Sequence, residues 1–242
     1  MSISTELLYQ FDSYLKEFEA RVVEVIERSI VLNRTAFHPR TGGVANDLGV
    51  ICIGDRRLDV VDVYIDREKK TVIHVVEGTL EGVEPGSTIR GAIDWNRRYR
   101  LMRLHTAAHI LAAIMYRDYG ALITGGSVEP DHAYDDYSLD KFDKKVFEDV
   151  VLKANEIVRR GLEVKIYWLK RDEALMIPGI IKLAERMPPE VESLRIVEIP
   201  NVDMQADGGP HVRNTREVGE IVMLKAENRG RNRKRLYYTV KP

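Results

Sequence analysis

The segment Arg103-Leu-His-Thr-Ala-Ala-His-Ile-Leu-Ala-Ala113 is a run of good helix formers that carries two histidines four residues apart. Residues at positions i and i+4 lie on one face of a helix, so the imidazoles of His105 and His109 can reach a single metal ion. A third histidine ends the segment Asp207-Gly-Gly-Pro-His211, far downstream. The spacing predicts a zinc site assembled from one helix and one distant loop.

The hydrophobic pattern changes near residue 92. Before it, short β-branched runs separated by turn residues predict a small barrel or sandwich, with strands over residues 21–26, 29–32, 49–53, 58–64 and 70–76. After it, helical periodicity predicts helices over 95–119 and 140–160, followed by Gly120 and Gly161. Further strands are expected at 163–168, 194–199 and 219–225. We therefore predict an α+β protein, with a β-barrel subdomain over residues 1–92 and a mixed α/β domain over residues 93–242.

Composition excludes several classes of protein. Lys and Arg number 37 against 38 Asp and Glu, so no global basic field points to nucleic acid, and any basic surface must be local. The only cysteine, Cys52, excludes an intramolecular disulfide and suggests a reducing compartment. Neither a targeting pattern nor an apolar run of membrane-spanning length is present, so we expect a cytoplasmic protein without a membrane partner.

Two interpretations of the histidines are open on these residues alone. In one, His105, His109 and His211 bind zinc, with Asp207 or water as the fourth ligand. In the other, paired histidines on an alanine-rich helix form a hydrogen-bonded polar patch. Metalloprotease helices of this kind carry a general-base Glu beside the first histidine, and Thr106 occupies that position, which disfavours peptide hydrolysis.

Two glycine-rich segments also have two possible interpretations, a ligand-binding loop or an ordinary turn. Thr41-Gly-Gly43 and Gly208-Gly209 are places where a backbone can approach a ligand closely and offer N–H donors. Ordinary turns use such residues as well.

Several ordered motifs together resemble the editing module of alanyl-tRNA synthetase and the free-standing AlaX alanyl-tRNA editing proteins. The family pattern Arg-x-His-Thr-Ala-x-His is matched throughout by Arg103-Leu-His-Thr-Ala-Ala-His109. Similar segments run nearly end to end: Phe37-His-Pro-Arg-Thr-Gly-Gly-Val-Ala-Asn-Asp-Leu-Gly49, His74-Val-Val-Glu-Gly78, Gly91-Ala-Ile-Asp-Trp-Asn-Arg-Arg98, Asp207-Gly-Gly-Pro-His211 and a closing hairpin over 225–240. The resemblance favours the metal interpretation and implies a second domain like the editing domains of alanyl- and threonyl-tRNA synthetases.

Two positions depart from the family pattern. Asp207 stands where the family usually has a cysteine ligand, and an oxygen donor is harder than a thiolate. Val44 stands where synthetase editing modules have a glutamine after the paired glycines, so that polar side chain is absent here.

The resemblance implies ATP-independent trans-editing, in which the ester joining serine, or glycine, to the terminal adenosine of tRNA(Ala) is hydrolysed. This ester is activated relative to a peptide, so the site needs mainly to place a water and stabilise an oxyanion. We expect the Thr41 hydroxyl to bind the serine side chain beside Gly42 and Gly43. Asp203 and Gln205 either pair with that serine hydroxyl or orient the metal ligands, and Gly208 and Gly209 line the substrate.

Contacts with tRNA must use local charge. Arg97, Arg98, Arg100 and Arg103 crowd the start of the histidine helix, and Arg103 is our candidate for substrate binding there. The last hairpin carries further basic residues, Arg229, Arg231, Arg233, Lys234 and Arg235. Of these, Arg231, Arg233 and Arg235 are predicted to bind substrate phosphates, with Tyr237 or Tyr238 stacking on a base. A solvated hairpin tip would look similar.

Two rival functions remain open from the sequence. One is a zinc hydrolase of small esters or amides that binds no RNA. The other is a non-catalytic tRNA-binding module in which zinc is structural, so that metal removal unfolds the second domain. Neither the serine against glycine preference nor the oligomeric state follows from the residues.

Overall fold

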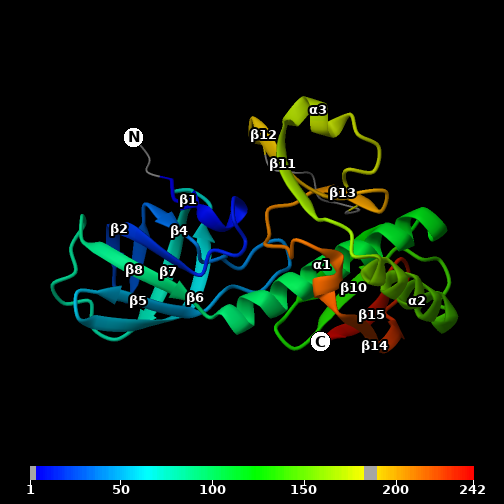
Figure 1. Ribbon diagram of the computed structural model, residues 1–242, viewed down its shortest axis with the longest axis horizontal. Coiled ribbons are helices and arrows are strands. Elements are labelled where there is room, and N and C mark those ends of the chain that lie inside the picture. The colour runs from blue at the N-terminus through cyan, green and yellow to red at the C-terminus, as the bar shows by residue number, and fades with distance from the viewer. Residues whose placement is uncertain (1–3, 183–189) are drawn as a thin grey trace. The chain divides into compact units, whose positions relative to one another are not determined.

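Six strands close into an antiparallel barrel in the first of two units into which the chain divides, residues 1–99 and 100–242. The structure is a computed structural model that describes residues 4–182 and 190–242 (Figure 1). Around the barrel the strands follow the order β2 (Glu17–Ile26), β3 (Ser29–Leu32), β7 (Thr71–Glu77), β6 (Arg56–Asp66), β5 (Gly49–Ile53) and β8 (Thr88–Ile93). A short helix η1 (Leu8–Gln10) follows β1 (Glu6–Leu7), which pairs in parallel with β4 (Arg34–Thr35).

The barrel core follows from period-two alternation in its strands. Buried and exposed residues alternate along most of β2, for example, because successive side chains point to opposite faces of a strand. Its inward residues pack with the buried side chains Phe37, Ile51 and Val63. The barrel and the α+β class are confirmed. Strand β8 was not predicted, because the change of pattern at Gly91 lies inside it.

A fully buried ion pair joins the glycine-rich segment to the start of helix α1 within the first unit. The guanidinium of Arg98 donates to both carboxylate oxygens of Asp47, from Nε at 3.0 and 3.1 Å and also from Nη2, and both side chains are 0% exposed. It also donates to the carbonyls of Ser13 and Ala36, at 3.0 and 2.6 Å. The sequence placed Arg98 in an RNA-binding cluster, whereas the structure uses it to hold the segment that carries Thr41.

Helix α1 (Trp95–Tyr119) is buried around most of its circumference. Asp94 caps its first turn by accepting the Arg97 N–H at 3.1 Å, and Gly120 ends it in a left-handed conformation at φ 63°. Leu101, Met102 and Leu104 are 0% exposed although they point in different directions around the helix axis. A helix that is apolar on all sides belongs to the interior, so its two histidines are carried into a buried setting.

Two sheets make up the second unit. One has the order β14 (Glu220–Asn228), β15 (Lys234–Lys241), β10 (Ala133–Tyr137) and β9 (Ile123–Val128). The other has the order β11 (Lys165–Lys170), β12 (Ser193–Ile199) and β13 (Asp203–Ala206), beside the short helix α3 (Arg171–Leu175). Helix α2 (Lys144–Arg160) is tied to β14 by Asn155, which exchanges two 2.8 Å hydrogen bonds with the backbone of Ile221. A short helix η2 (Thr215–Val218) precedes β14.

The predicted elements of the second half are mostly present. Helix α1 has the predicted bounds, and α2 starts at Lys144 after its cap Asp143, four residues later than predicted. Strands β9, β10 and β13 were missed: β9 contains two glycines, β10 contains two aspartates, and β13 is only four residues long. The unit division falls at residues 99/100, after the first turn of α1, and the predicted domain boundary at 92/93 stays a prediction. Among the described residues, no helix is long and apolar enough to span a membrane.

We predict that Arg98→Met destabilises the first unit by about 3 to 5 kcal/mol, because the variant leaves the Asp47 carboxylate buried without its cation. Denaturant unfolding monitored by Trp95 fluorescence, in a Trp168→Phe background, would measure this. The control is Arg90→Met, since Arg90 pairs with Glu19 on the surface with side-chain exposures of 80 and 60%. Equal unfolding midpoints for the two variants would contradict the prediction.

Candidate metal centre

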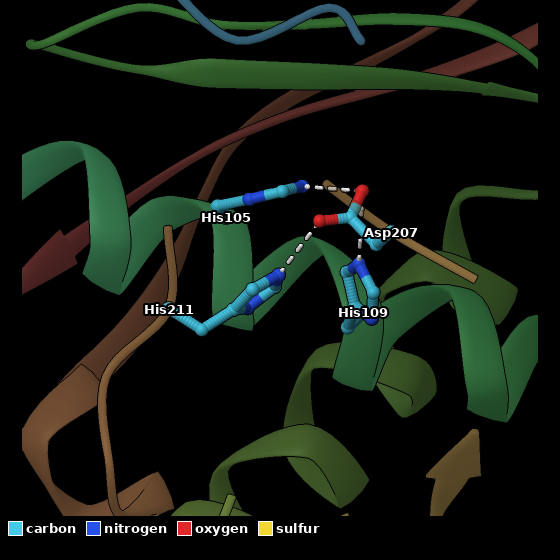
Figure 2. A group of neighbouring side chains, drawn as sticks. All are labelled: His105, His109, Asp207 and His211. Carbon is cyan, nitrogen blue, oxygen red and sulfur yellow. Dashed lines mark hydrogen bonds and ion pairs between the residues drawn. The ribbon is translucent and has the colours of Figure 1, made fainter. Parts of the chain in front are cut away.

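Three imidazoles and one carboxylate converge at a single point in the second unit (Figure 2). His105 and His109 come from α1, and Asp207 and His211 come from the loop after β13. One ligand atom from each of the four residues lies within 4.8 Å of the other three. The Nε2 atoms of His105, His109 and His211 lie 3.6, 4.0 and 3.2 Å from the Asp207 carboxylate.

These spacings are close to those around a tetrahedral metal ion. Tetrahedral zinc with ligand bonds of about 2.0–2.2 Å places neighbouring donor atoms roughly 3.3–3.6 Å apart. Three imidazole nitrogens and a carboxylate oxygen are a donor set that zinc accepts, as do other first-row divalent metals. The cluster therefore has the composition and spacing of a metal centre.

The second nitrogen of each imidazole has a protein partner. Nδ1 of His109 lies 3.0 Å from Asp203 Oδ2, Nδ1 of His105 lies 3.3 Å from the carbonyl of Pro210, and Nδ1 of His211 lies 3.1 Å from Thr106 Oγ1. With Nδ1 engaged in each ring, Nε2 is the nitrogen that faces the centre. Partners of this kind fix the orientation and tautomer of metal-binding histidines.

Backbone contacts hold the loop that carries Asp207. The N–H of Gly209 donates to Asp207 Oδ1 at 2.7 Å, and Arg195 Nη1 donates to the carbonyls of Asp207 and Gly209 at 2.8 and 3.0 Å. A Cβ at position 209 would lie 2.6 Å from Cε1 of His105. Glycine is therefore required because the loop backbone packs directly against a ligand ring.

Burial and mutual charge set the protonation of the cluster. Burial lowers the pKa of His105 to about 4, against an opposing contribution from Asp207. Burial, together with the two neighbouring histidines, holds the pKa of His211 well below its usual value. Burial would raise the pKa of Asp207, but the surrounding histidines hold it well below the usual range. Neutral imidazoles and an ionised carboxylate are the forms that bind metal.

His109 differs from the other two ligands. Burial alone would lower its pKa, but the hydrogen bond and the charge of Asp203 together raise it. Among the three ligand histidines, His109 is the one whose Nδ1 contacts a carboxylate.

Comparison with known proteins agrees with this architecture. Residues 194–237 match the family described as threonyl and alanyl tRNA synthetase second additional domain, and residues 3–97 match class II (A) tRNA synthetases. The chain is 51% identical over 242 residues to the alanyl-tRNA editing protein AlaX-M of Saccharolobus solfataricus, covering 98% of this chain and 100% of that protein. It is 35% identical to the AlaX-M protein of Methanosarcina barkeri, covering 98 and 99%.

The chain belongs to the AlaX-M family of alanyl-tRNA editing proteins. It is also 34% identical over 226 residues to the alanine–tRNA ligase of Thermococcus kodakarensis, of which it covers 24%. The family relationship agrees with the resemblance seen in the sequence motifs, including Arg103-Leu-His-Thr-Ala-Ala-His109.

Two residues proposed from the sequence lie beside His109 in this AlaX-M family member. Asp203 and Gln205 project from the same face of β13, and Gln205 Nε2 lies 2.9 Å from Asp203 Oδ2 and 3.4 Å from His109 Nδ1. Of the two roles left open by the sequence, these contacts favour orientation of a ligand over pairing with a substrate hydroxyl.

Thr41, Gly42 and Gly43 lie in the first unit. They form a tight turn in which the backbones of Thr41 and Val44 exchange hydrogen bonds of 3.3 and 3.0 Å. Both glycines have positive φ, 63 and 82°, as such a turn requires. An ordinary turn explains the backbone conformation of these residues. The role of Thr41 in substrate binding stays a prediction.

The arginines at the start of α1 are used within the protein. Arg103 is 8% exposed and donates to the carbonyls of Val218 and Lys241, and Arg100 donates to Thr239 Oγ1 at 2.8 Å. Arg97 donates to the carbonyl of Asn46 at 2.8 Å. These contacts are structural, so phosphate binding by Arg103 stays a prediction without support from its surroundings.

The hairpin residues divide into buried and exposed groups. Arg235 is 8% exposed and forms two 2.8 Å hydrogen bonds to Asp136, which also accepts from Arg233 at 3.1 Å. Arg231 is exposed. Tyr238 is 0% exposed and donates to Asp135, whereas Tyr237 is half-buried beside Tyr134, with ring centroids 5.5 Å apart.

Three residues of the centre were missed or undervalued from the sequence. Thr106 was noted only as the absence of a glutamate, yet its hydroxyl contacts His211 and accepts the Val212 N–H at 3.3 Å. Arg195, a single cation within the apolar run of β12, was a detectable signal, because a charge in a buried strand needs a specific partner. Lys182 lies outside the strands and helices predicted from the sequence, so nothing in the sequence indicated that it would be buried.

We predict that Gly209→Ala lowers the affinity for zinc about tenfold or more, because the added Cβ forces the His105 ring out of position. Competition with a chromophoric chelator would measure the affinity. The matched control is Gly125→Ala in β9, where the added Cβ lies 3.3 Å from a side-chain oxygen of Asp136, outside the cluster. Unchanged zinc affinity in a folded Gly209→Ala variant would show that the loop tolerates the methyl group.

Proposed function

We propose that this protein is a zinc-dependent trans-editing deacylase that hydrolyses the ester of tRNA(Ala) carrying serine, and also glycine. One observation carries the proposal. Three buried Nε2 atoms and a carboxylate converge in a chain 51% identical to a protein named for alanyl-tRNA editing. We propose that it acts in the cytoplasm, where aminoacyl-tRNA is used. The single cysteine, Cys52, and the lack of a targeting pattern favour this location.

His105, His109, His211 and Asp207 would hold the zinc ion. When bound, zinc supplies a Lewis acid, which polarises an oxygen or makes a water more acidic. The protein residues do the rest: Asp203, Thr106 and the Pro210 carbonyl orient the imidazoles, and Arg195 fixes the loop backbone.

The chemistry that this arrangement must support is modest. An aminoacyl ester is already activated, so a preorganised electrophile and a positioned water can suffice without a strong general base. This agrees with Thr106 in the position where metalloproteases have a glutamate. The Thr106 hydroxyl is occupied by His211 and the Val212 N–H, so its contacts are those of an orienting group.

Selectivity against alanine requires a partner for the serine hydroxyl. We propose Thr41 for this role, flanked by Gly42 and Gly43, because a pocket built around a hydroxyl leaves its own polar group unpaired when alanine binds. Gly208 and Gly209 would line the ester end of the substrate, since the backbone there lies against His105.

The tRNA would contact the exposed tip of the β14–β15 hairpin. Arg229, Arg231 and Arg233 are exposed there, between strands that bear Lys225 and Tyr237. We propose that Arg231 and Arg233 bind phosphates and that Tyr237 offers a partly exposed ring for stacking. Arg235 would act indirectly, by holding Asp136 and packing against the Tyr134 ring at 3.8 Å.

We predict that His105→Ala removes zinc and lowers deacylation of Ser-tRNA(Ala) about a hundredfold or more, because one ligand of the electrophile is lost. The rates on seryl-, glycyl- and alanyl-tRNA(Ala) and the bound zinc should be measured on native and variant protein. The control is His132→Ala, since His132 bonds to Asp131 at 2.9 Å outside the cluster.

The outcome separates editing from a non-catalytic role in which the metal is structural. Loss of activity and zinc with retained circular dichroism, and recovery when zinc is returned to chelator-treated native protein, supports editing. Native protein that contains zinc but deacylates none of the three substrates would overturn it. Unfolding of the second unit on chelation would favour a structural metal.

We predict that Arg231→Gln weakens tRNA binding and reduces the slope of log affinity against log salt by roughly 0.7–0.9, the effect of one lost phosphate contact. Lys153→Gln is the control, because that lysine lies on α2 and pairs with Asp118 and Asp149. Turnover of a small ester model substrate should be unaffected by either change. An unchanged salt slope in Arg231→Gln would remove the hairpin from the RNA interface.

A further inference from the structure

Lys182 is a buried lysine that no step of the proposed mechanism uses. It is 6% exposed, and lysine is rarely buried unless its ammonium is paired. Its Nζ lies 2.9 Å from the Gly179 carbonyl, 3.2 Å from the Met204 carbonyl and 2.6 Å from Asp203 Oδ1. The two carbonyl contacts are hydrogen bonds, and the contact with the carboxylate is an ion pair.

Asp203 is the link between this lysine and the metal centre. Its side chain is 0% exposed, and its two oxygens are divided between two directions. Oδ1 faces Lys182, and Oδ2 accepts from Gln205 Nε2 at 2.9 Å and contacts His109 Nδ1 at 3.0 Å. Asp203 therefore connects the Lys182 ammonium to the ring of the candidate metal ligand His109 through two successive contacts.

We infer that Lys182 is a positioning residue for the metal ligand His109 and acts through Asp203. The ammonium holds Oδ1, so the carboxylate plane cannot turn and Oδ2 stays directed at the ring. It also supplies the positive charge that a buried carboxylate needs, since an uncompensated buried charge is strongly unfavourable. The His109 ring is thereby fixed with Nε2 facing the other three ligands.

The anchoring of Lys182 supports this role. Its carbonyl accepts the Ile123 N–H at 2.9 Å, so the residue is tied to β9 as well as to β13. The Tyr116 ring of α1 lies 5.8 Å from the ammonium. An open pocket of about 290 Å³, lined in part by Tyr116, Gly179, Lys182 and Asp203, adjoins the pair. This space can admit the larger guanidinium of an arginine at position 182.

The inference rests on the proposed zinc site, and the test is chosen so that the two can fail separately. Lys182→Met keeps most of the side-chain volume and removes the charge. We expect its zinc affinity to fall between about ten- and a hundredfold, the range found when an outer partner of a metal ligand is lost. Lys182→Arg should retain most of the affinity, because it restores a cation beside Asp203.

The double variant Lys182→Met/Asp203→Asn gives the sharper comparison. An asparagine oxygen can still accept from His109 Nδ1–H, and no buried carboxylate is left without a cation. We therefore expect it to bind zinc more tightly than Lys182→Met alone, a non-additivity that residues acting independently would not show. Lys153→Met, which removes an exposed lysine paired with Asp118 and Asp149, is the control for the loss of one positive charge.

Three readouts distinguish positioning from a general structural role: zinc affinity, the visible absorption spectrum of the cobalt-substituted protein, and the unfolding midpoint of the metal-free protein. Positioning predicts a weaker affinity and an altered cobalt spectrum in Lys182→Met, both restored in Lys182→Arg. A lower unfolding midpoint with unchanged affinity and spectrum would overturn the inference. If Lys182→Met fails to fold, the Arg and double variants decide in the same way. Native protein that binds neither metal would instead refute the zinc site itself.

Discussion

Both nitrogens of each buried imidazole must have a partner, and the second unit is organised around this requirement. A buried polar atom left without one costs about 1–3 kcal/mol. His105, His109 and His211 meet the requirement on the Nδ1 side through Pro210, Asp203 and Thr106, which lie on three different parts of the chain. Helix α1, strand β13 and the following loop are thus held in one arrangement before any metal binds.

Three buried cations each pair with a neighbouring acid. Arg98 pairs with Asp47 in the first unit, and Lys182 with Asp203 and Arg235 with Asp136 in the second. Arg98 and Arg235 belong to the basic clusters visible in the sequence, and in the folded protein their charges are balanced by these acids. The hairpin tip keeps Arg229, Arg231 and Arg233 exposed.

The donor set has a chemical consequence for an editing protein. Asp207 contributes a harder donor than a thiolate would, and one of its oxygens is already held by the Gly209 N–H. The carboxylate lies beside three imidazoles, and Arg195 supports the backbone that carries it. Such a centre is preorganised by hydrogen bonds more than by its own ligand strength, which suits the hydrolysis of an activated ester.

Local sequence determined a large part of this protein. Strand alternation predicted the barrel, helical periodicity predicted α1 with its bounds, and the i, i+4 spacing put His105 and His109 on one face, because these patterns depend only on neighbouring residues. The histidine at the end of a distant glycine-rich segment suggested His211 and Asp207 as further ligands, and the family motifs favoured that interpretation. Tertiary structure alone decided the rest. It buried Arg98 and Arg103, which look like RNA ligands in the sequence, and it brought Lys182 and Arg195 to the metal centre. Which carboxylate or carbonyl a long cationic side chain reaches depends on residues tens to more than a hundred positions away, and no local pattern records that choice.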